Sequence, residues 1–254
     1  MHLTETCDAE APHLITDVQT TVATAADVDQ VSKIQADLAT RGLSPAEQIV
    51  DAGYVSSHHL LTSQQVHGID LVGPMPGNQS WQARAQQGYA TTDFILDWPA
   101  RQARCPQGQT STKWVTTHDP QGHPVELVRF APATCQPCPV RTACTRSTKG
   151  GRVLSMRPQA DQQVLAAARV RQLTPDFQAL YATRAGIEGT LSQALRLAGL
   201  RRARYIGLAK THLQHLLTAT AVNLLRVAAW LIGRPLARTR KSPFASLGRA
   251  PALA

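Results

Sequence analysis

The sequence predicts an α/β fold whose central sheet is interrupted by an inserted, β-rich segment. Strand-like and helix-like segments alternate over residues 1–72, helical periodicity disappears over residues 73–151, and long helical segments follow up to residue 234. Such an alternation is typical of a sheet covered by helices. The chain has 254 residues, of which 43% are apolar, and this suffices for one sizeable domain with an insertion or for two small domains.

The segment of residues 1–72 carries the alternating elements. Short apolar or β-branched runs predict strands, and apolar residues at helical spacing predict a helix. Strands are expected at residues 2–6, 12–24, 48–51 and 69–72, and helices at residues 26–41 and 58–66. The first of these helices has its apolar stripe at Val28, Val31, Ile34 and Leu38.

The rest of the chain divides into three further segments. Pro, Gly, Gln, Thr and Trp dominate residues 73–151, so a β-rich subdomain is expected there. Residues 152–234 are expected to be helical, with helices at residues 158–171, 174–198 and 205–232. The packing surface of the last helix is expected at Leu213, Leu216, Leu217, Val227 and Leu231. Residues 235–254 form a basic tail.

The charges are distributed very unevenly along the chain. Residues 1–140 carry 7 Lys and Arg against 14 Asp and Glu, whereas residues 141–254 carry 19 against 3. A segment this basic predicts a polyanionic partner, above all a nucleic acid. A solvated surface or an anionic membrane surface are the alternatives, but a solvated surface usually mixes both signs.

Part of this positive charge precedes and opens the last expected helix. Arg201, Arg202, Arg204 and Lys210 are predicted to contact the phosphate backbone of DNA, because nothing nearby resembles a recognition helix that reads bases. The alternative is a solvated helix face.

The first residues, the most apolar stretch and the cysteines indicate the cellular compartment of the protein. The start of the chain carries acids and no apolar run, so no secretory signal is expected. The stretch of residues 216–233 holds Asn223 and Arg226 near its middle, which disfavours a membrane span and favours a partly buried helix. An odd number of five cysteines argues against a disulfide framework, so we expect a cytoplasmic protein that does not bind membranes.

Asp51 stands where an expected strand ends and a turn begins, before Gly53. The carboxyl ends of strands in open α/β sheets face the crevice where ligands and metals bind, so this acid is a candidate metal ligand. A lone Asp before Gly is more often a turn or cap residue, and this alternative stays open without a partner acid.

A second candidate acid lies in the motif Tyr-x2-Arg-x3-Glu, formed by Tyr181, Arg184 and Glu188. On one continuous helix the three residues would share a face, because Arg184 would lie about 60° and Glu188 about 20° from Tyr181. Such a face offers a carboxylate for a metal ion and a guanidinium for a phosphate group. The alternative is a simple salt bridge between Glu188 and Arg184.

This motif resembles the signature of the DDE transposases of one large group of bacterial insertion sequences, and IVDAGY, which contains Asp51, is similar to the context of their second catalytic acid. The stretches HLTETC, PHLITDV, DLVGP, SWQAR and RRARYIGLAKTHLQHLLTA also look like this family, in the same order. The resemblance covers essentially the whole chain. It implies a ribonuclease H-like mixed sheet flanked by helices, divided into a first part at residues 1–72 and a helical second part at residues 152–234.

The resemblance also implies roles for single residues. Asp51 and Glu188 would bind Mg²⁺ or Mn²⁺, and Tyr181 and Arg184 would lie near DNA phosphates. The family often has Lys seven residues after the Glu, where this chain has Leu195, so Arg196 is expected to substitute for it.

One departure from the family concerns the first catalytic Asp, which lies upstream on the first strand of the fold. This chain resembles the family from the second strand onward, so a truncated copy with little or no activity is expected. The implied partner is double-stranded DNA, namely insertion-sequence ends and target, bound by a homo-oligomer associated with the bacterial nucleoid. The alternatives are a non-catalytic DNA-binding remnant and a nuclease of the same fold.

Four cysteines lie in the inserted segment, at Cys105, Cys135, Cys138 and Cys144. Four thiolates that include one Cys-x2-Cys pair can hold a tetrahedral Zn²⁺, which predicts a structural zinc ribbon. Reduced cysteines without a metal are the alternative, because only one such pair is complete. Cys7 lies outside the group and is expected to be an ordinary buried thiol.

Overall fold

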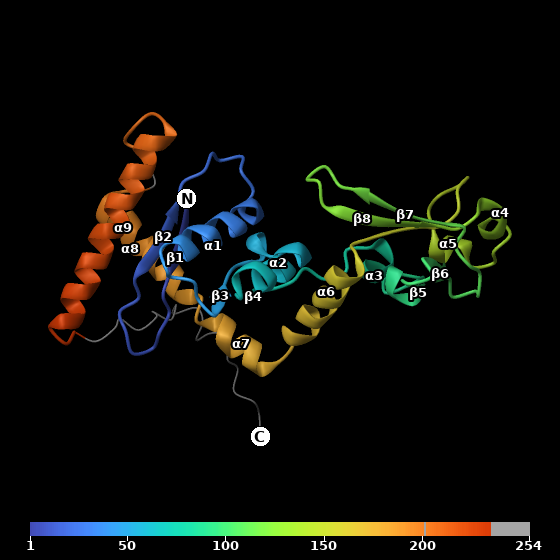
Figure 1. Cartoon of the computed structure of the whole chain (residues 1–254), viewed down its shortest axis with the longest axis horizontal. Coiled ribbons are helices and arrows are strands. Elements are labelled where there is room, and N and C mark those ends of the chain that lie inside the picture. The colour runs from blue at the N-terminus through green and yellow to red at the C-terminus, as the bar shows by residue number, and fades with distance from the viewer. Residues whose placement is uncertain (201, 235–254) are drawn as a thin grey trace, which may run out of the picture. The chain divides into compact units, whose positions relative to one another are not determined.

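The computed structural model describes residues 1–200 and 202–234, which form two compact units (Figure 1). Unit 1 contains residues 1–55, residues 63–73 and the described residues from Thr174 onward, and unit 2 contains residues 56–62 and 74–173. The helix α2 (Ser57–His67) contributes residues to both. Helices and small sheets occur in both units, and this mixed composition confirms the predicted α/β class. Unit 2 includes residues 152–173, which the sequence analysis grouped with the helical segment.

The strands of unit 1 form two separate two-stranded sheets within the described residues. Strands β1 (His2–Glu5) and β2 (Ile15–Gln19) are antiparallel, with His2 opposite Gln19. Strands β3 (Glu47–Ile49) and β4 (Asp70–Val72) are parallel, with Glu47 opposite Asp70. All four strands lie where the sequence predicts them, although each is shorter than the apolar run that predicts it.

The described helices of unit 1 are η1 (Asp27–Gln30), α1 (Val31–Thr40), η2 (Ala52–Tyr54), α7 (Pro175–Ala182), α8 (Ala185–Ala198) and α9 (Leu208–Leu231). Helices α1, α8 and α9 lie beside the hairpin β1–β2 (Figure 1). One core cluster combines Ile15, Val18, Ala194, Ala219 and Val222. It therefore joins the hairpin β1–β2 to α8 and α9.

The helix predicted over residues 174–198 is in fact two helices, α7 and α8, separated by Thr183 and Arg184. The backbone N–H groups of Thr183, Arg184 and Gly186 each bond to the carbonyl three residues before, which tightens the chain into a turn. The Thr183 hydroxyl also donates to the Leu180 carbonyl at 2.7 Å, a local bond that competes with regular helix. The expectation of one continuous helix was wrong for this reason.

Helix α9 buries a different face from the expected one. Its buried residues are Gln214, Thr218, Ala219 and Val222, whereas Leu213, Leu216, Leu217 and Leu231 are 40–70% exposed. The buried face is suited to close contact with the hairpin, because Asn223 bonds to both the N–H and the carbonyl of Ile15, at 2.8 and 2.9 Å. The bonds of Asn223 to the Ile15 backbone thus decide which face of α9 packs on the hairpin. The spacing of the leucines does not indicate this face. None of the helices in the described parts of the chain combines the length and apolar character needed to cross a bilayer.

A buried ion pair explains why an arginine lies in this apolar helix. Arg226 Nη1 lies 3.0 Å from Glu5 Oε2, and the two side chains are only 18% and 6% exposed. Arg226 also donates to the His13 carbonyl at 2.6 Å and to Thr190 Oγ1 at 2.5 Å, and Thr190 donates to Glu5 Oε2 at 2.5 Å. The network connects β1, the β1–β2 connection, α8 and α9.

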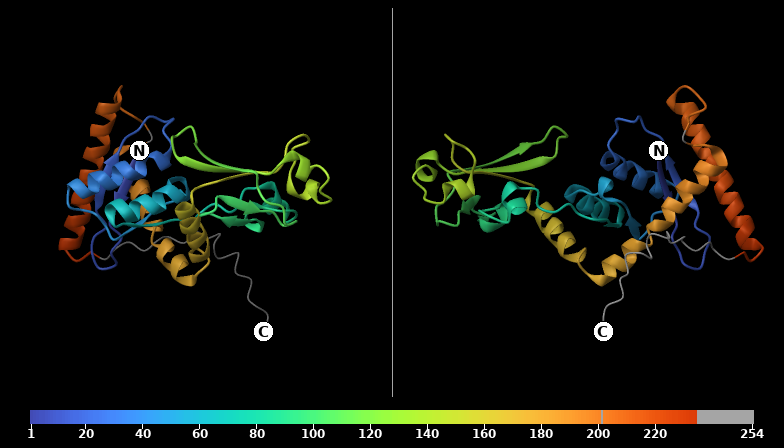
Figure 2. Two further views of the ribbon diagram at one scale, coloured as in Figure 1. Left: turned by 45° about the vertical axis from the view of Figure 1, so that its right-hand side comes forward. Right: turned by 180° about the vertical axis from the view of Figure 1, so that it is seen from behind.

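Unit 2 contains the predicted β-rich segment. Its strands are β5 (Ile95–Asp97), β6 (Gln102–Arg104), β7 (Lys113–His118), β8 (Pro124–Arg129) and β9 (Val153–Met156). Its helices are α3 (Trp81–Ala85), η3 (Thr91–Asp93), α4 (Pro132–Cys135), α5 (Arg141–Cys144) and α6 (Gln159–Arg171). Strands β7, β8 and β9 form an antiparallel sheet, and the long hairpin β7–β8 is visible in both views of Figure 2. The core of the unit is built on this sheet, around Val128, Phe130 and Leu154.

Replacing Arg226 by Met should destabilise the protein by about 3–5 kcal/mol, because the Glu5 carboxylate would remain buried without its cation. Urea unfolding followed by circular dichroism measures this. The matched control is Lys210→Met, an exposed cation on the same helix, which should cost less than about 0.5 kcal/mol. The double variant Glu5→Leu/Arg226→Met should recover most of the loss. Equal destabilisation by Arg226→Met and by Lys210→Met would contradict a buried ion pair.

Candidate active site

Asp51 lies just beyond the carboxyl end of β3, as predicted, and begins the short helix η2. Its Oδ1 accepts a hydrogen bond from the Gly53 N–H at 2.8 Å. A Cβ atom on Gly53 would lie 3.1 Å from Asp51 Oδ1 and 3.2 Å from Asp27 Oδ2, which is tighter than most real contacts. The glycine of the Asp-x-Gly-Tyr motif therefore keeps space open beside the carboxylate. The cap role that sequence analysis left as an alternative is present, and one carboxylate oxygen remains available.

Two residues that the sequence analysis did not assign to the site support this turn. The Tyr54 hydroxyl lies 2.5 Å from Nδ1 of the buried His2, and His2 Nε2 lies 3.0 Å from Thr21 Oγ1. Burial raises the pKa of Tyr54 to about 12, and the carboxylates of Asp27 and Asp51 act in the same direction. Burial also lowers the pKa of His2 from its ordinary value, so a neutral ring faces a protonated phenol. Tyr54 belongs to the quoted motif, but no pattern pointed to His2.

Arg184 contacts both Tyr181 and Glu188, although Tyr181 lies in α7, Glu188 lies in α8 and Arg184 lies in the turn between these helices. The Arg184 guanidinium lies 5.6 Å from the centroid of the Tyr181 ring, and Arg184 Nη2 lies 3.2 Å from Glu188 Oε1. Tyr181 is in turn stacked on Phe177, with 5.7 Å between ring centroids. Arg184 is 26% exposed and Glu188 is 68% exposed, so the carboxylate is open to solvent while the guanidinium is partly enclosed. The predicted grouping holds, and the ion pair of the alternative interpretation is also present.

A cavity of about 590 Å³ within unit 1 brings these two regions together. Asp51, Arg184 and Glu5 line it, whereas Glu188 does not line it and is ion-paired with Arg184. Carboxylate oxygens are the donors that Mg²⁺ prefers, so the donor type fits this ion. The number of donors does not, because residues 1–200 and 202–234 contain no group of three or more His, Cys, Asp or Glu arranged to hold a metal.

The other predicted DNA-binding cations lie around the ends of α8 and α9. Arg196 donates to Ser192 Oγ at 3.0 Å on the surface of α8. Arg202, Arg204 and Lys210 are exposed, and no acid is ion-paired with them in the described parts of the chain. Arg201 and the predicted basic tail lie outside the described residues.

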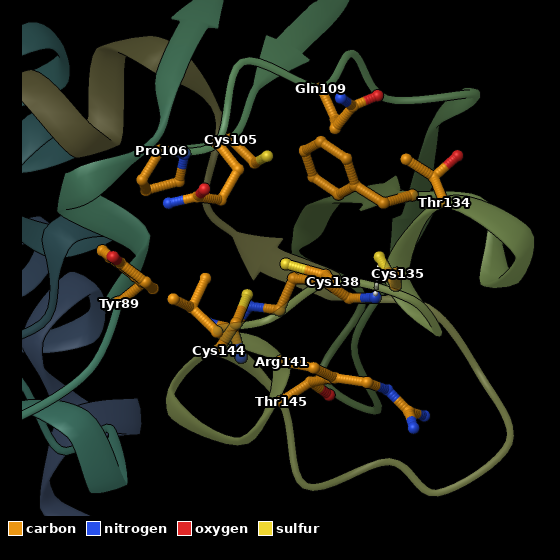
Figure 3. Close-up of a pocket in the computed structure, with 14 residues that line it drawn as sticks. Tyr89, Cys105, Pro106, Gln109, Thr134, Cys135, Cys138, Arg141, Cys144 and Thr145 are labelled. Atoms are coloured by element: carbon orange, nitrogen blue, oxygen red, sulfur yellow. Dashed lines mark hydrogen bonds between the residues drawn. The ribbon is translucent and has the colours of Figure 1, made fainter.

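The four cysteines of unit 2 line one small cavity of about 30 Å³, and Figure 3 shows their side chains around it. Burial raises the pKa of Cys144, with further contributions from the three other thiols, whereas Arg152 acts in the opposite direction. The Arg152 N–H donates to Cys135 Sγ at 3.5 Å. The grouping of the four residues is thus as predicted, but their sulfur atoms do not form a ready ligand set. Cys7 is exposed, so the expectation of a buried thiol was wrong.

Comparison with known proteins indicates a family that part of the chain resembles. Residues 104–228 match the model of a family described as the transposase DDE domain. No curated protein and no solved structure matches the chain. The matched segment includes the cysteine group together with Tyr181, Arg184 and Glu188, whereas Asp51 lies before it. Residues 104–228 are therefore similar to a transposase DDE domain, which confirms the resemblance to the DDE transposases that the motifs indicated.

Proposed function

We propose that the protein is a transposase of a bacterial insertion sequence that cleaves and joins DNA strands, with Asp51 and Glu188 as catalytic carboxylates. The observation that supports this proposal is that Asp51 and Arg184, the ion-pair partner of Glu188, both line the cavity of unit 1. The matched transposase domain supports the reaction class. A ribonuclease H-like arrangement of the strands belongs to the same proposal.

The chemistry of this class needs divalent cations. Mg²⁺ or Mn²⁺, when bound, would activate the attacking water or 3′-hydroxyl and stabilise the leaving oxygen. Asp51 and Glu188 would hold the ions through their free oxygens. Arg184 would orient a DNA phosphate, because its planar guanidinium can bond to two phosphate oxygens at once. Tyr181 would hold that guanidinium in place through the contact with its ring.

Two acids are fewer than such a site uses. A pair of metal ions about 3.5–4 Å apart is normally held by several carboxylates. Glu5 lines the same cavity, but its side chain is only 6% exposed and its Oε2 is held by Arg226 and Thr190, so metal binding there would disrupt a buried ion pair. We therefore propose that this chain alone binds DNA and cleaves it only weakly. The same contacts argue against a nuclease that uses Glu5 as its third acid.

Weak Mg²⁺- or Mn²⁺-dependent nicking of DNA carrying insertion-sequence ends should disappear in Asp51→Asn and in Glu188→Gln. Loss of a catalytic group typically lowers the rate roughly 100-fold or more, which would bring the nicking below detection. A supercoiled-plasmid relaxation assay measures it. Glu10→Gln, an exposed acid that does not line the cavity, is the control and should nick like the original chain. Robust nicking that neither Asp51→Asn nor Glu188→Gln reduces would rule out these two residues as the catalytic acids.

The proposed partner is double-stranded DNA, bound through its backbone by a homo-oligomer in the bacterial cytoplasm, associated with the nucleoid. Arg196, Arg201, Arg202, Arg204 and Lys210 are the proposed contacts. Arg202, Arg204 and Lys210 are exposed, and no acid in residues 1–200 and 202–234 forms an ion pair with them, which supports this role.

Each lost phosphate contact should lower the slope of log Kobs against log salt by about 0.9, so Arg202→Ala/Arg204→Ala/Lys210→Ala should reduce it by roughly 2–3 units. Fluorescence anisotropy of labelled duplex DNA at several salt concentrations measures the slope. The control is Lys33→Ala, which should leave the slope unchanged. It is matched to Lys210→Ala because both lysines are exposed and lie on helices. An unchanged slope in the triple variant would leave these residues as a solvated surface.

We further propose a structural Zn²⁺ in unit 2, held by Cys105, Cys135, Cys138 and Cys144. The support is that all four side chains line one cavity and that a backbone N–H already faces Cys135 Sγ. Zinc binding then requires the thiols to lose their protons and to turn towards one point. The zinc would hold the loops of α4 and α5 together and would take no part in cleavage.

The purified chain should contain about one zinc ion, and Cys138→Ser should lose most of it. Inductively coupled plasma mass spectrometry after dialysis gives the metal content, and circular dichroism reports the fold. Cys7→Ser is the matched control, because Cys7 is exposed and lies in unit 1. A folded protein with a zinc content near zero would end this proposal.

A further inference from the structure

Helix α9 turns its polar side chains inward, the reverse of an ordinary surface helix. His212 Nδ1 and His215 Nδ1 lie 3.1 and 2.7 Å from Thr20 Oγ1, and Asn223 and Arg226 bond to the same hairpin β1–β2. An ordinary surface helix turns its apolar face to the core and its polar face to water. Helix α9 lies at the outer edge of unit 1, so its other side faces away from the hairpin (Figures 1 and 2).

The side of α9 that faces away from the hairpin carries a regular row of apolar residues. We name this row the outer seam; its members follow one another at alternating intervals of four and three residues and are Leu213, Leu217, Thr220, Leu224, Val227 and Leu231. At 100° per residue, both ends of the row lie about 180° around the helix axis from the buried Val222. The four leucines of the outer seam are 55–70% exposed.

An exposed row with this spacing is suited to contact with another helix. Apolar residues at alternating intervals of three and four are the pattern by which two helices interlock side by side. Leu216 and Trp230, which are 40% and 52% exposed, widen the apolar surface on one side of the row. Continuous exposed apolar patches of this kind mark protein–protein contacts.

The outer seam is complementary to itself. Its intervals read four, three, four, three, four from either end, so an antiparallel copy of α9 places every seam residue opposite another. The resulting pairs are Leu213 with Leu231, Leu217 with Val227, and Thr220 with Leu224. A contact between two identical chains about a two-fold axis requires such a self-complementary surface.

The charges and the polar group of α9 also favour a second copy as the partner. Residues 211–232 contain one Lys, Arg, Asp or Glu, namely Arg226, and it is paired with Glu5 on the hairpin side. The outer seam therefore selects no partner of opposite charge. Its one polar residue, Thr220, donates its hydroxyl to the Leu216 carbonyl at 2.9 Å, so its burial would leave no donor unpaired.

We propose that two copies of the chain bind each other through the outer seams of α9, packed antiparallel about a two-fold axis. An antiparallel pair also brings opposite ends of the two helix dipoles together. A homo-oligomer belongs to the proposed function, on which this contact rests for its role. The contact itself needs no DNA, because it depends only on the outer seam.

The full chain without DNA should form dimers at micromolar concentrations, measured by sedimentation velocity. Leu224→Glu places a charge near the middle of the contact and should weaken dimerisation by roughly 30-fold or more. The matched control is Val170→Glu on α6, because Val170 is 68% exposed and Leu224 is 66% exposed. It should change dimerisation by less than about twofold, and circular dichroism checks that both variants fold.

The double variant Thr220→Lys/Leu224→Glu tests the identity and the direction of the partner. In an antiparallel dimer the new lysine of one chain faces the new glutamate of the other, so dimerisation should recover by about tenfold or more relative to Leu224→Glu. In a parallel pair like charges would meet, and a partner other than a second copy would not carry the compensating charges.

The inference is overturned if the chain is monomeric at micromolar concentrations, if Leu224→Glu dimerises as well as Val170→Glu, or if the double variant recovers nothing. Sedimentation with added insertion-sequence DNA separates these results from a failure of the proposed function. Assembly on DNA that is equal with and without Leu224→Glu would keep the proposed homo-oligomer and exclude α9 as its interface. A dimer formed through α9 by a chain that does not bind DNA would support the contact and count against the proposed function.

Discussion

The buried contact of Arg226 with Glu5 and Thr190 is the interaction on which the placement of the site depends. It connects β1 to α8 and α9, and α8 begins at Ala185, directly after Arg184 and one turn before Glu188. The position of the Arg184–Glu188 pair beside the cavity thus follows from a polar network inside unit 1. Removing charges from water costs free energy. In the Arg226–Glu5 pair this cost is offset by the hydrogen bonds that both side chains make with Thr190. The clamp of Asn223 on Ile15 acts in the same place and aligns α9 with the hairpin.

The charged side chains around the cavity of unit 1 come from both its strand side and its helical side. The carboxylate of Asp51 sits in a turn kept open by Gly53 and flanked by a protonated Tyr54, so the turn adds no further charge there at neutral pH. Arg184, which also lines the cavity, is paired with Glu188.

Sequence patterns predicted the elements well where one pattern determines them. The alternating segments gave β1 to β4 and α1, and the apolar stripe of α1 is indeed buried at Val31, Ile34 and Leu38. The four cysteines were correctly grouped because they lie close in sequence around one hairpin. Asp51 and Glu188 were singled out from their motifs, and the structure places Asp51 and the partner of Glu188 on one cavity.

Features that depend on single side-chain hydrogen bonds could not be predicted from the spacing of apolar residues. The break between α7 and α8 comes from local bonds at Thr183, which periodicity does not register. The buried face of α9 is set by Asn223 and by small residues, so the leucine pattern indicated the opposite face. His2 supports the turn of Asp51 through Tyr54, a contact between residues 52 positions apart, and no spacing rule detects it. The separation of the two sheets appears only when all strands are placed together.

The central claim is that Asp51 and Glu188 act on the same divalent ion site. Titration of the ¹⁵N-labelled chain with Mn²⁺, followed by nuclear magnetic resonance, tests it most directly because the ion broadens signals of nearby amides. The account predicts that the amides of Ala52 and Gly53 and those of Glu188 and Gly189 broaden together, at the same Mn²⁺ concentration. Broadening of only one group, or of neither, would contradict a shared site.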